Sequence, residues 1–190
     1  MAERRTAWRV KQLGLNPQHL VFIDETAVKT NLTRLRGRAP RGQRLVEKVP
    51  YGHWKTTTLI AALDMRGMRC ALTVDGAVNG EVFRAFVRQV LAPALHPGDL
   101  VVLDNLAAHK VAGVREAITA AKAEVVYLPP YSPDFNPIEN AFSKLKQKLR
   151  SAQHRTQEKL WGNTQQALET ITPEDANGYF RHCGYTLQVG

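Results

Sequence analysis

The sequence has few cysteines, no long hydrophobic run and fewer acidic than basic residues. Its only two cysteines, Cys70 and Cys183, lie far apart and outside any CxxC motif, so we expect reduced thiols rather than a disulfide framework. No stretch approaches the about 20 apolar residues of a membrane-spanning helix. The first residues, MAERRTAWRV, are charged and lack the apolar region of a secretion signal. These absences predict a cytoplasmic protein without a membrane partner.

Basic residues are in clear excess. The chain of 190 residues carries 26 Lys and Arg against 17 Asp and Glu, a formal net charge of +9. Many of the basic residues lie between residues 29 and 55, where Glu47 is the single acid. A clustered excess of this kind predicts a nucleic-acid partner, although a merely basic soluble protein is the alternative. The side chains expected to contact phosphate are Arg34, Arg36, Arg38, Arg41, Arg44, Lys144 and Lys148.

The order of apolar and amphipathic segments predicts an α/β domain with a mixed sheet. We expect a lead-in or linker over residues 1–19, a main α/β domain over 20–155 and a helical extension over 156–190. Within the domain, 31–55 reads as a basic loop or hairpin excursion, because it lacks apolar periodicity. The predicted strands are 20–23, 56–63, 68–74, 100–103 and 124–128. The predicted helices are 79–95, 109–122, 138–150 and 156–170.

Three acidic residues stand where secondary-structure elements end or begin. Asp24 and Asp104 each follow an apolar strand, while Glu25 should point to the opposite face from Asp24. Glu139 lies in the first turn of a helix that follows a proline-rich segment. One interpretation is a capping box, in which Asn136 caps the helix and Glu139 reaches back to it. The other is a metal ligand, because ligands gather at the carboxyl ends of strands.

Carboxylates without a histidine or cysteine cluster favour a hard cation. Mg²⁺ takes oxygen ligands, retains waters and commonly combines few carboxylates with phosphate oxygens. Two such ions about 4 Å apart would activate a nucleophile and stabilise the leaving oxygen in phosphoryl transfer. The basic surface would attract the anionic strand. Together, the acids and the basic segments predict chemistry on a DNA strand.

Three segments carry a family resemblance: IDET, LDNLAAHK and YSPDFNPIEN. They resemble the DDE transposases of the mariner superfamily, specifically its bacterial insertion-sequence branch, over about residues 18–155. The intervals agree with the family pattern, since 79 residues separate Asp24 from Asp104 and 34 separate Asp104 from Glu139. The resemblance implies a ribonuclease H-like fold with a five-stranded sheet. It also implies that Asp24, Asp104 and Glu139 bind two Mg²⁺ or Mn²⁺ ions.

The resemblance extends to activity, partners and neighbouring residues. It implies hydrolytic cleavage at transposon ends, followed by attack of a 3′-hydroxyl on target DNA. Asn105 and His109 match positions that support the site in the family, and the 31–55 excursion matches a loop that can contact a second subunit. We therefore expect a homodimer on DNA, at the nucleoid when bound.

One departure leaves alternatives. Family members carry an N-terminal helix-turn-helix region, whereas this chain reaches Asp24 within two dozen residues. The chain is then half of a frame-split element with a separate N-terminal DNA-binding chain, a truncated remnant or a catalytic fragment. A non-catalytic DNA-binding remnant and a metal-dependent nuclease of the same fold are the alternative functions.

Overall fold

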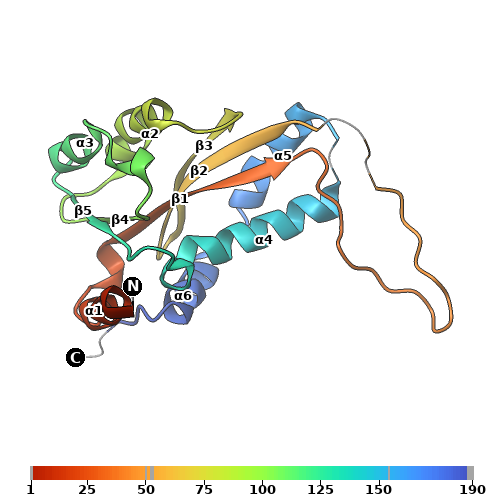
Figure 1. Cartoon of the computed structure of the whole chain (residues 1–190), viewed down its shortest axis with the longest axis horizontal. Helices are drawn as coiled ribbons and strands as arrows, with labels where there is room; N and C mark the ends of the chain where they lie inside the picture. Colours follow the sequence, from red (N-terminus) through yellow and green to blue (C-terminus); the bar gives the residue numbers. More distant parts are fainter. Residues whose placement is uncertain (1, 50, 52–53, 154, 188–190) are drawn as a thin grey trace.

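A computed structural model describes residues 2–49, 51, 54–153 and 155–187. Its described residues form one mixed sheet of five strands in the order β3-β2-β1-β4-β5, flanked by helices (Figure 1). The predicted α/β class and five-stranded sheet are therefore confirmed. The strands are β1 (Leu20–Lys29), β2 (Thr56–Asp64), β3 (Gly67–Asp75), β4 (Leu100–Leu103) and β5 (Glu124–Tyr127).

Strand β1 is the central element and runs further than its apolar segment predicts. It pairs parallel with β4 only as far as Ile23 opposite Leu103, then continues antiparallel to β2 until Lys29 lies opposite Thr56. After Ile23, β1 pairs with β2 alone, and this pairing keeps the following polar residues in the strand. Because β4 and its partner β5 stop here, the carboxyl ends of β4 and β5 leave an open edge beside the extended half of β1.

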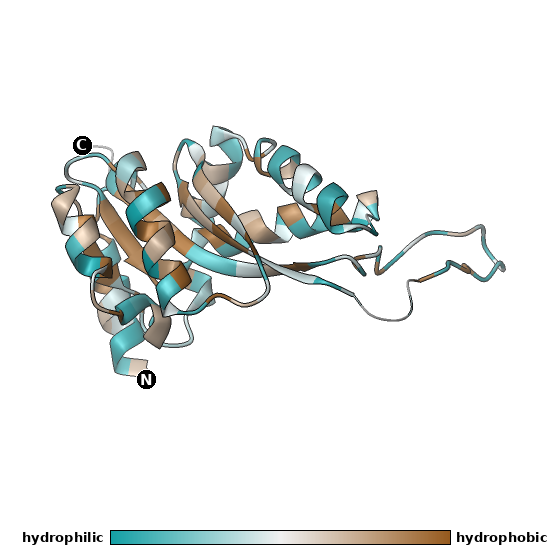
Figure 2. Ribbon diagram, turned by 90° about the horizontal axis from the view of Figure 1, so that it is seen from above, coloured by the Kyte–Doolittle hydropathy of each residue, from teal (hydrophilic) through white to brown (hydrophobic). Residues whose placement is uncertain are grey.

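The alternating strand residues build two cores, one on each face of the sheet. Leu20 and Phe22 pack with α4 (Pro137–Ala152) and the C-terminal helices. Val21 and Ile23 pack with α2 (Gly80–Phe86) and α3 (Val114–Ala120). Figure 2 shows the hydrophobic residues concentrated along the strands and on the helix faces that cover them. Successive residues of β1 therefore face different helical layers, one on each side of the sheet.

Two predicted helices are broken into shorter pieces. The segment predicted as 79–95 forms α2, then a π-helical turn η2 (Val87–Leu91) and a 3-10 turn η3 (Ala92–Ala94). The segment predicted as 109–122 begins as the 3-10 turn η4 (Ala107–Lys110), and α3 starts only after Gly113. Gly113 has φ +90, a left-handed conformation that interrupts a right-handed helix.

The segments near both ends of the described chain pack onto the hydrophobic core of the sheet. Residues predicted as a lead-in form α1 (Ala2–Gln12) and a 3-10 turn η1 (Pro17–His19), and Trp8 of α1 is buried in the core. The predicted C-terminal extension contains α5 (Gln157–Leu168) and α6 (Pro173–His182), whose Leu160 and Phe180 join the same core. The polar composition of both segments gave no sign that they pack on the core. A few apolar side chains are enough to bind them once the core surface has formed.

The predicted basic excursion is a loop that projects away from the body (Figure 1). Its described residues 30–49, 51 and 54–55 contain neither helix nor strand. Residues 50 and 52–53 of the excursion lie outside the described part. The base of the loop is closed where Thr30 N–H donates to the Lys55 carbonyl and Arg155 donates to the Leu32 carbonyl. No helix among the described residues is long and apolar enough to cross a membrane.

Candidate active site

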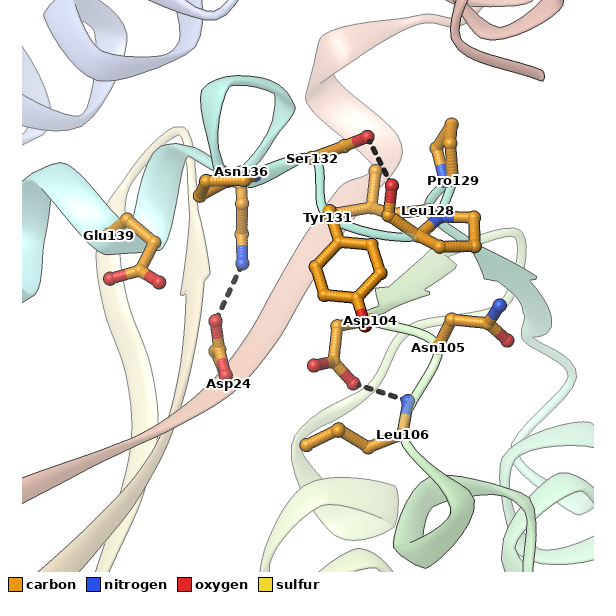
Figure 3. Close-up of a pocket in the computed structure, with 12 residues that line it drawn as sticks. Asp24, Asp104, Asn105, Leu106, Leu128, Pro129, Tyr131, Ser132, Asn136 and Glu139 are labelled. Carbon is orange, nitrogen blue, oxygen red and sulfur yellow. Dashed lines mark hydrogen bonds between the residues drawn. The ribbon is translucent and has the colours of Figure 1, made fainter. Parts of the chain in front are cut away.

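Asp24 and Asp104 lie side by side because their strands are parallel neighbours. Ile23 is opposite Leu103 in the β1–β4 ladder, so the next residue of each chain segment is an aspartate at the same edge. Both aspartates line a pocket of about 320 Å³, together with Glu139 (Figure 3). The remaining wall is the proline-rich segment from Leu128 to Asn136 and the turn of Asn105 and Leu106.

Glu139 enters the pocket from the first turn of α4, and the predicted capping box is not formed. Asn136 does precede Pro137 at the start of the helix, but its side chain makes no capping hydrogen bond. Instead, Asn136 Nδ2 donates to Asp24 Oδ2 at 2.8 Å, as Figure 3 shows. Glu139 is exposed toward the pocket. The residue that was interpreted as a helix cap is therefore a partner of the first carboxylate.

Asp24 is held between one hydrogen-bond donor on each oxygen and several negative neighbours. The Glu25 N–H donates to its Oδ1 at 2.7 Å, and Asn136 holds Oδ2. Burial disfavours the charged form and raises the pKa of Asp24 to about 7, and the Glu139 and Asp104 carboxylates push it the same way. The Glu25 N–H acts in the opposite direction. The pocket thus concentrates negative charge that a cation would relieve.

Asp104 has a cationic partner that Asp24 lacks. His109 Nδ1 lies 2.6 Å from Asp104 Oδ1, and the Leu106 N–H donates to the same oxygen. Burial opposes ionisation of Asp104, but His109, the Leu106 amide and Lys110 outweigh it, so the pKa of Asp104 lies below its ordinary value. The structure therefore keeps this carboxylate charged at neutral pH.

The fully buried His109 is bracketed by two acids. Its Nε2 lies 2.9 Å from Glu25 Oε1, opposite the contact to Asp104, and its ring stacks on Phe83 at 4.2 Å between centroids. Burial lowers the pKa of His109, but the adjacent carboxylates of Asp104 and Glu25 outweigh burial and raise it to about 9. Glu25 faces away from Asp24, as predicted, and its partner on that side is His109.

The donor set suits a hard divalent cation, although the side chains are not closed around one. Among the described residues, no three His, Cys, Asp or Glu side chains form a ready-made metal cage. Mg²⁺ does not need such a cage, since it commonly uses one or two carboxylates, several waters and phosphate oxygens. Asp24, Asp104 and Glu139 around one pocket supply oxygen ligands of this type, and the Glu139 and Asp104 carboxylates add to the effect of burial in raising the pKa of Asp24.

The other predicted site residues fall into three groups. Asn105 lines the pocket and accepts a hydrogen bond from Lys110. The predicted loop arginines are all exposed, and so is Lys148 of α4. Lys144 is instead paired with Asp175 of α6 and donates to the Thr170 carbonyl. Its ammonium group is therefore already engaged in holding two helices together.

A family comparison matches most of the chain, residues 19–161 of 190, to the model described as DDE superfamily endonuclease. The chain belongs to the DDE superfamily of endonucleases. The matched range begins just before β1 and ends within α5, so it contains Asp24, Asp104 and Glu139. A comparison with curated proteins found no significant match.

Solved structures agree with this assignment at the level of the fold. The Mos1 transposase paired-end complex with left transposon end has 19% identity and a TM-score of 0.76, covering 95% of this chain and 56% of that one. The Mos1 transposase catalytic domain with Raltegravir and Mn has 20% identity and a TM-score of 0.69, covering 95% and 86%. The fold is thus ribonuclease H-like, as predicted. This endonuclease-family chain spans about half the length of the chain in the paired-end complex.

Several residues that shape the pocket gave little signal in the sequence. Asn136 lies inside YSPDFNPIEN but reads equally well as a helix cap. Tyr131 lines the pocket, is 84% exposed and has φ +54, a left-handed conformation that non-glycine residues rarely adopt. The sequence shows a tyrosine between two prolines, but the exposure of its ring beside the acids depends on the turn.

Proposed function

We propose that this endonuclease-family chain is the catalytic domain of a transposase of the mariner superfamily, in its bacterial insertion-sequence branch. It would cleave DNA at transposon ends and transfer the 3′-hydroxyl strand into target DNA. The observation that carries the proposal is the meeting of Asp24, Asp104 and Glu139 in one pocket at the strand ends. Mos1 structures with the same fold, solved with transposon-end DNA and with Mn or Mg, support it.

Two divalent ions are the proposed cofactors, Mg²⁺ or Mn²⁺, with Asp24, Asp104 and Glu139 as ligands. When bound, such ions supply an activated oxygen nucleophile and stabilise the leaving oxygen. The side chains of the chain itself prepare the ligand positions. Asn136 and the Glu25 amide orient the two oxygens of Asp24, and His109 and the Leu106 amide orient Asp104. Glu139 completes the set from a helix whose start is fixed by Pro137.

The proposed DNA surface combines the projecting loop with the exposed side of α4. The loop arginines are free of the core and can approach a phosphate backbone, and Lys148 is exposed on α4. A loop of this length also suits contact with a second subunit, so we propose a homodimer on DNA. We further propose that the protein acts in the cytoplasm, at the nucleoid.

The test uses short duplexes and a supercoiled plasmid, with Mn²⁺ as the metal. The parent protein is expected to nick the plasmid and to join pre-cleaved 3′-hydroxyl duplexes to it. Asp24→Asn, Asp104→Asn and Glu139→Gln are each expected to lower both activities by about a thousandfold or more, because each removes a proposed ligand, while DNA binding persists. Asp75→Asn is the matched control, since Asp75 ends β3 away from the pocket and is exposed.

Three outcomes would change the proposal. Nicking without joined products would replace the transposase by a nuclease of the same fold. DNA binding without nicking in the parent would favour a non-catalytic DNA-binding protein. Retained cleavage in any one of the three pocket variants would remove that residue from the catalytic set.

A further inference from the structure

A short hydrogen-bond chain links the two ends of the protein to the wall of the pocket. Trp8 Nε1 of α1 donates to the Tyr185 hydroxyl at 3.1 Å, and that hydroxyl donates to the Phe135 carbonyl at 2.8 Å. All three side chains are buried. A backbone carbonyl of the proline-rich turn is thus satisfied by a side chain from the C-terminal segment, which is itself held by the N-terminal helix.

Helix α1 also contacts the outer side of the proline-rich turn, through Arg5. Arg5 lies one helical turn before Trp8, so both side chains project from one face of α1. Its guanidinium makes two hydrogen bonds to Asp134, at 2.8 and 2.7 Å, and a third to Ser132 Oγ at 2.9 Å. It also lies over the Phe135 ring, 4.8 Å from the centroid. The turn is therefore held from both sides by α1, once directly and once through Tyr185.

The turn held in this way positions two residues of the pocket. It is the 3-10 segment η5 (Pro133–Phe135), closed by the Phe135 and Asn136 amides. Asn136 follows at once and donates to Asp24, and Glu139 lies three residues further on in the first turn of α4. A displacement of Phe135 would therefore move the amide that holds Asp24 and the start of the helix that carries Glu139.

We propose that Tyr185, fixed by Trp8, is a positioning residue that holds the η5 turn in the place from which Asn136 and Glu139 serve the carboxylate pocket. The two terminal segments thus act as one support beneath the site. Gln12 of α1 adds to this support by donating to the Gly184 carbonyl, next to Tyr185. Gly184 has φ +88, a left-handed conformation that favours glycine, and its lack of a Cβ leaves space for Gln12 Nε2.

The first test is Tyr185→Phe, which removes only the hydroxyl. The ring keeps its packing, since Tyr185 lies 5.1 Å from Phe22 and 6.1 Å from Phe180 between centroids. We expect faster hydrogen exchange at the Phe135 and Asn136 amides in the metal-free protein. We also expect the Mn²⁺ dissociation constant, measured from the free-Mn²⁺ resonance, to rise about tenfold, as for other residues that orient metal ligands.

The control is Thr164→Val, which removes another buried hydroxyl that donates to a backbone carbonyl. Thr164 Oγ1 bonds to the Leu160 carbonyl within α5, away from the pocket. This variant is expected to lose a similar amount of stability while leaving both the η5 amides and the Mn²⁺ affinity unchanged. A general loss of stability would instead change both variants alike and would overturn the proposal.

The two measurements separate this inference from the proposed function on which its metal-binding part rests. If the parent binds no Mn²⁺, the proposed function fails, and the exchange rates of the η5 amides decide the inference alone. If the parent binds Mn²⁺ and Tyr185→Phe alters neither quantity, the inference is overturned. Faster exchange with unchanged Mn²⁺ affinity would also overturn it, because the turn would then not govern the pocket.

A second variant keeps the test decisive if Tyr185→Phe does not fold. Arg5→Gln removes the outer grip at a partly exposed position, while Trp8 and Tyr185 remain in place. The same two amides are expected to exchange faster, by a smaller factor, and the Mn²⁺ affinity should fall by about threefold, as a weaker form of the ligand-orientation effect. If the Phe135 and Asn136 amides of a folded Arg5→Gln protein exchange at the parent rate, the proposal that α1 holds the η5 turn would be contradicted.

Discussion

Asp24 and Asp104 hold equivalent places in the sequence and in the sheet, but their surroundings differ. Each follows a buried apolar segment, within β1 for Asp24 and at the end of β4 for Asp104, and the parallel ladder sets them beside each other. Behind Asp104 lies His109, itself paired with Glu25, whereas Asp24 is oriented by the neutral amide of Asn136. Burial therefore raises the pKa of Asp24 to about 7, while the cation behind Asp104 outweighs burial and lowers its pKa. One half of the pocket is charge-balanced by the protein, and the other lacks a cation.

The strongest test of this contrast is to make the same change at both aspartates. In EDTA at pH 8, Asp104→Asn should lower the free energy of unfolding by about 2 kcal/mol, because it removes one partner of a buried histidine cation at a partly exposed pair. Asp24→Asn should raise it by about 2 kcal/mol, because it removes a charge that burial disfavours. Urea denaturation checks both, with Asp75→Asn as a neutral control. Changes of the same sign would contradict the contrast.

The affinity for Mn²⁺ should depend on whether Asp24 is protonated. Because the pKa of Asp24 is raised to about 7, the carboxylate is mostly protonated at pH 6 and mostly charged at pH 8. A cation must displace that proton, so Mn²⁺ affinity should fall about tenfold from pH 8 to pH 6. Calorimetry in two buffers of different ionisation enthalpy should show nearly one proton released per binding event at pH 6. Equal affinity at both pH values would remove Asp24 from the metal ligands.

The histidine behind Asp104 should produce a separate pH dependence. The folded protein keeps a proton on His109 up to about pH 9, whereas the unfolded chain loses it near 6.5. This contribution to stability is therefore fully present below pH 6.5 and disappears as the pH rises through 9. His109→Gln should lower stability by about 1 kcal/mol at pH 6.5 and flatten its decline toward pH 9. An unchanged slope between pH 6.5 and 9 would show that His109 does not carry this proton.

The contrast between the aspartates belongs to the pocket and should not depend on the loop. Replacing Arg36 and Arg38 by glutamine should leave stability and Mn²⁺ affinity unchanged, because both side chains are exposed and far from the core. It should reduce the salt dependence of DNA binding by about 0.9 for each arginine that contacts phosphate. Arg88 and Arg115, exposed on the opposite helical layer, form the control pair. Equal effects of the two pairs would argue for general charge rather than for a loop contact.

Much of the fold was readable from the sequence because its signals are local. The five strands were recognised as apolar runs, and the order of elements predicted a mixed sheet correctly. The end of β1 and the breaks in two helices were not predicted. In the first case a neighbouring strand extends a polar segment. In the others, a left-handed glycine and a π-helical turn interrupt an amphipathic pattern.

The candidate site divides in the same way. Asp24, Asp104 and Glu139 were identified from their places at the ends of strands and at the start of a helix, and those places follow from chain order and motif. Asn136, Tyr185 and Trp8 were missed because their role depends on contacts across the whole chain. Trp8 and Tyr185, for example, are 177 positions apart. Lys144 reads as a DNA contact on a basic helix, but the approach of α6 gives it a different partner.

By itself, the sequence determined which residues are acidic, where the five apolar strand segments lie, and that the chain is strongly basic. These properties depend on residue type and on short-range periodicity. The tertiary structure alone decided which carboxylate gains a cationic partner and which is left to burial, because a pKa depends on neighbours in space. It also decided that the two chain ends support the pocket, since a buried hydroxyl and a buried carbonyl find each other only after the sheet and helices have packed.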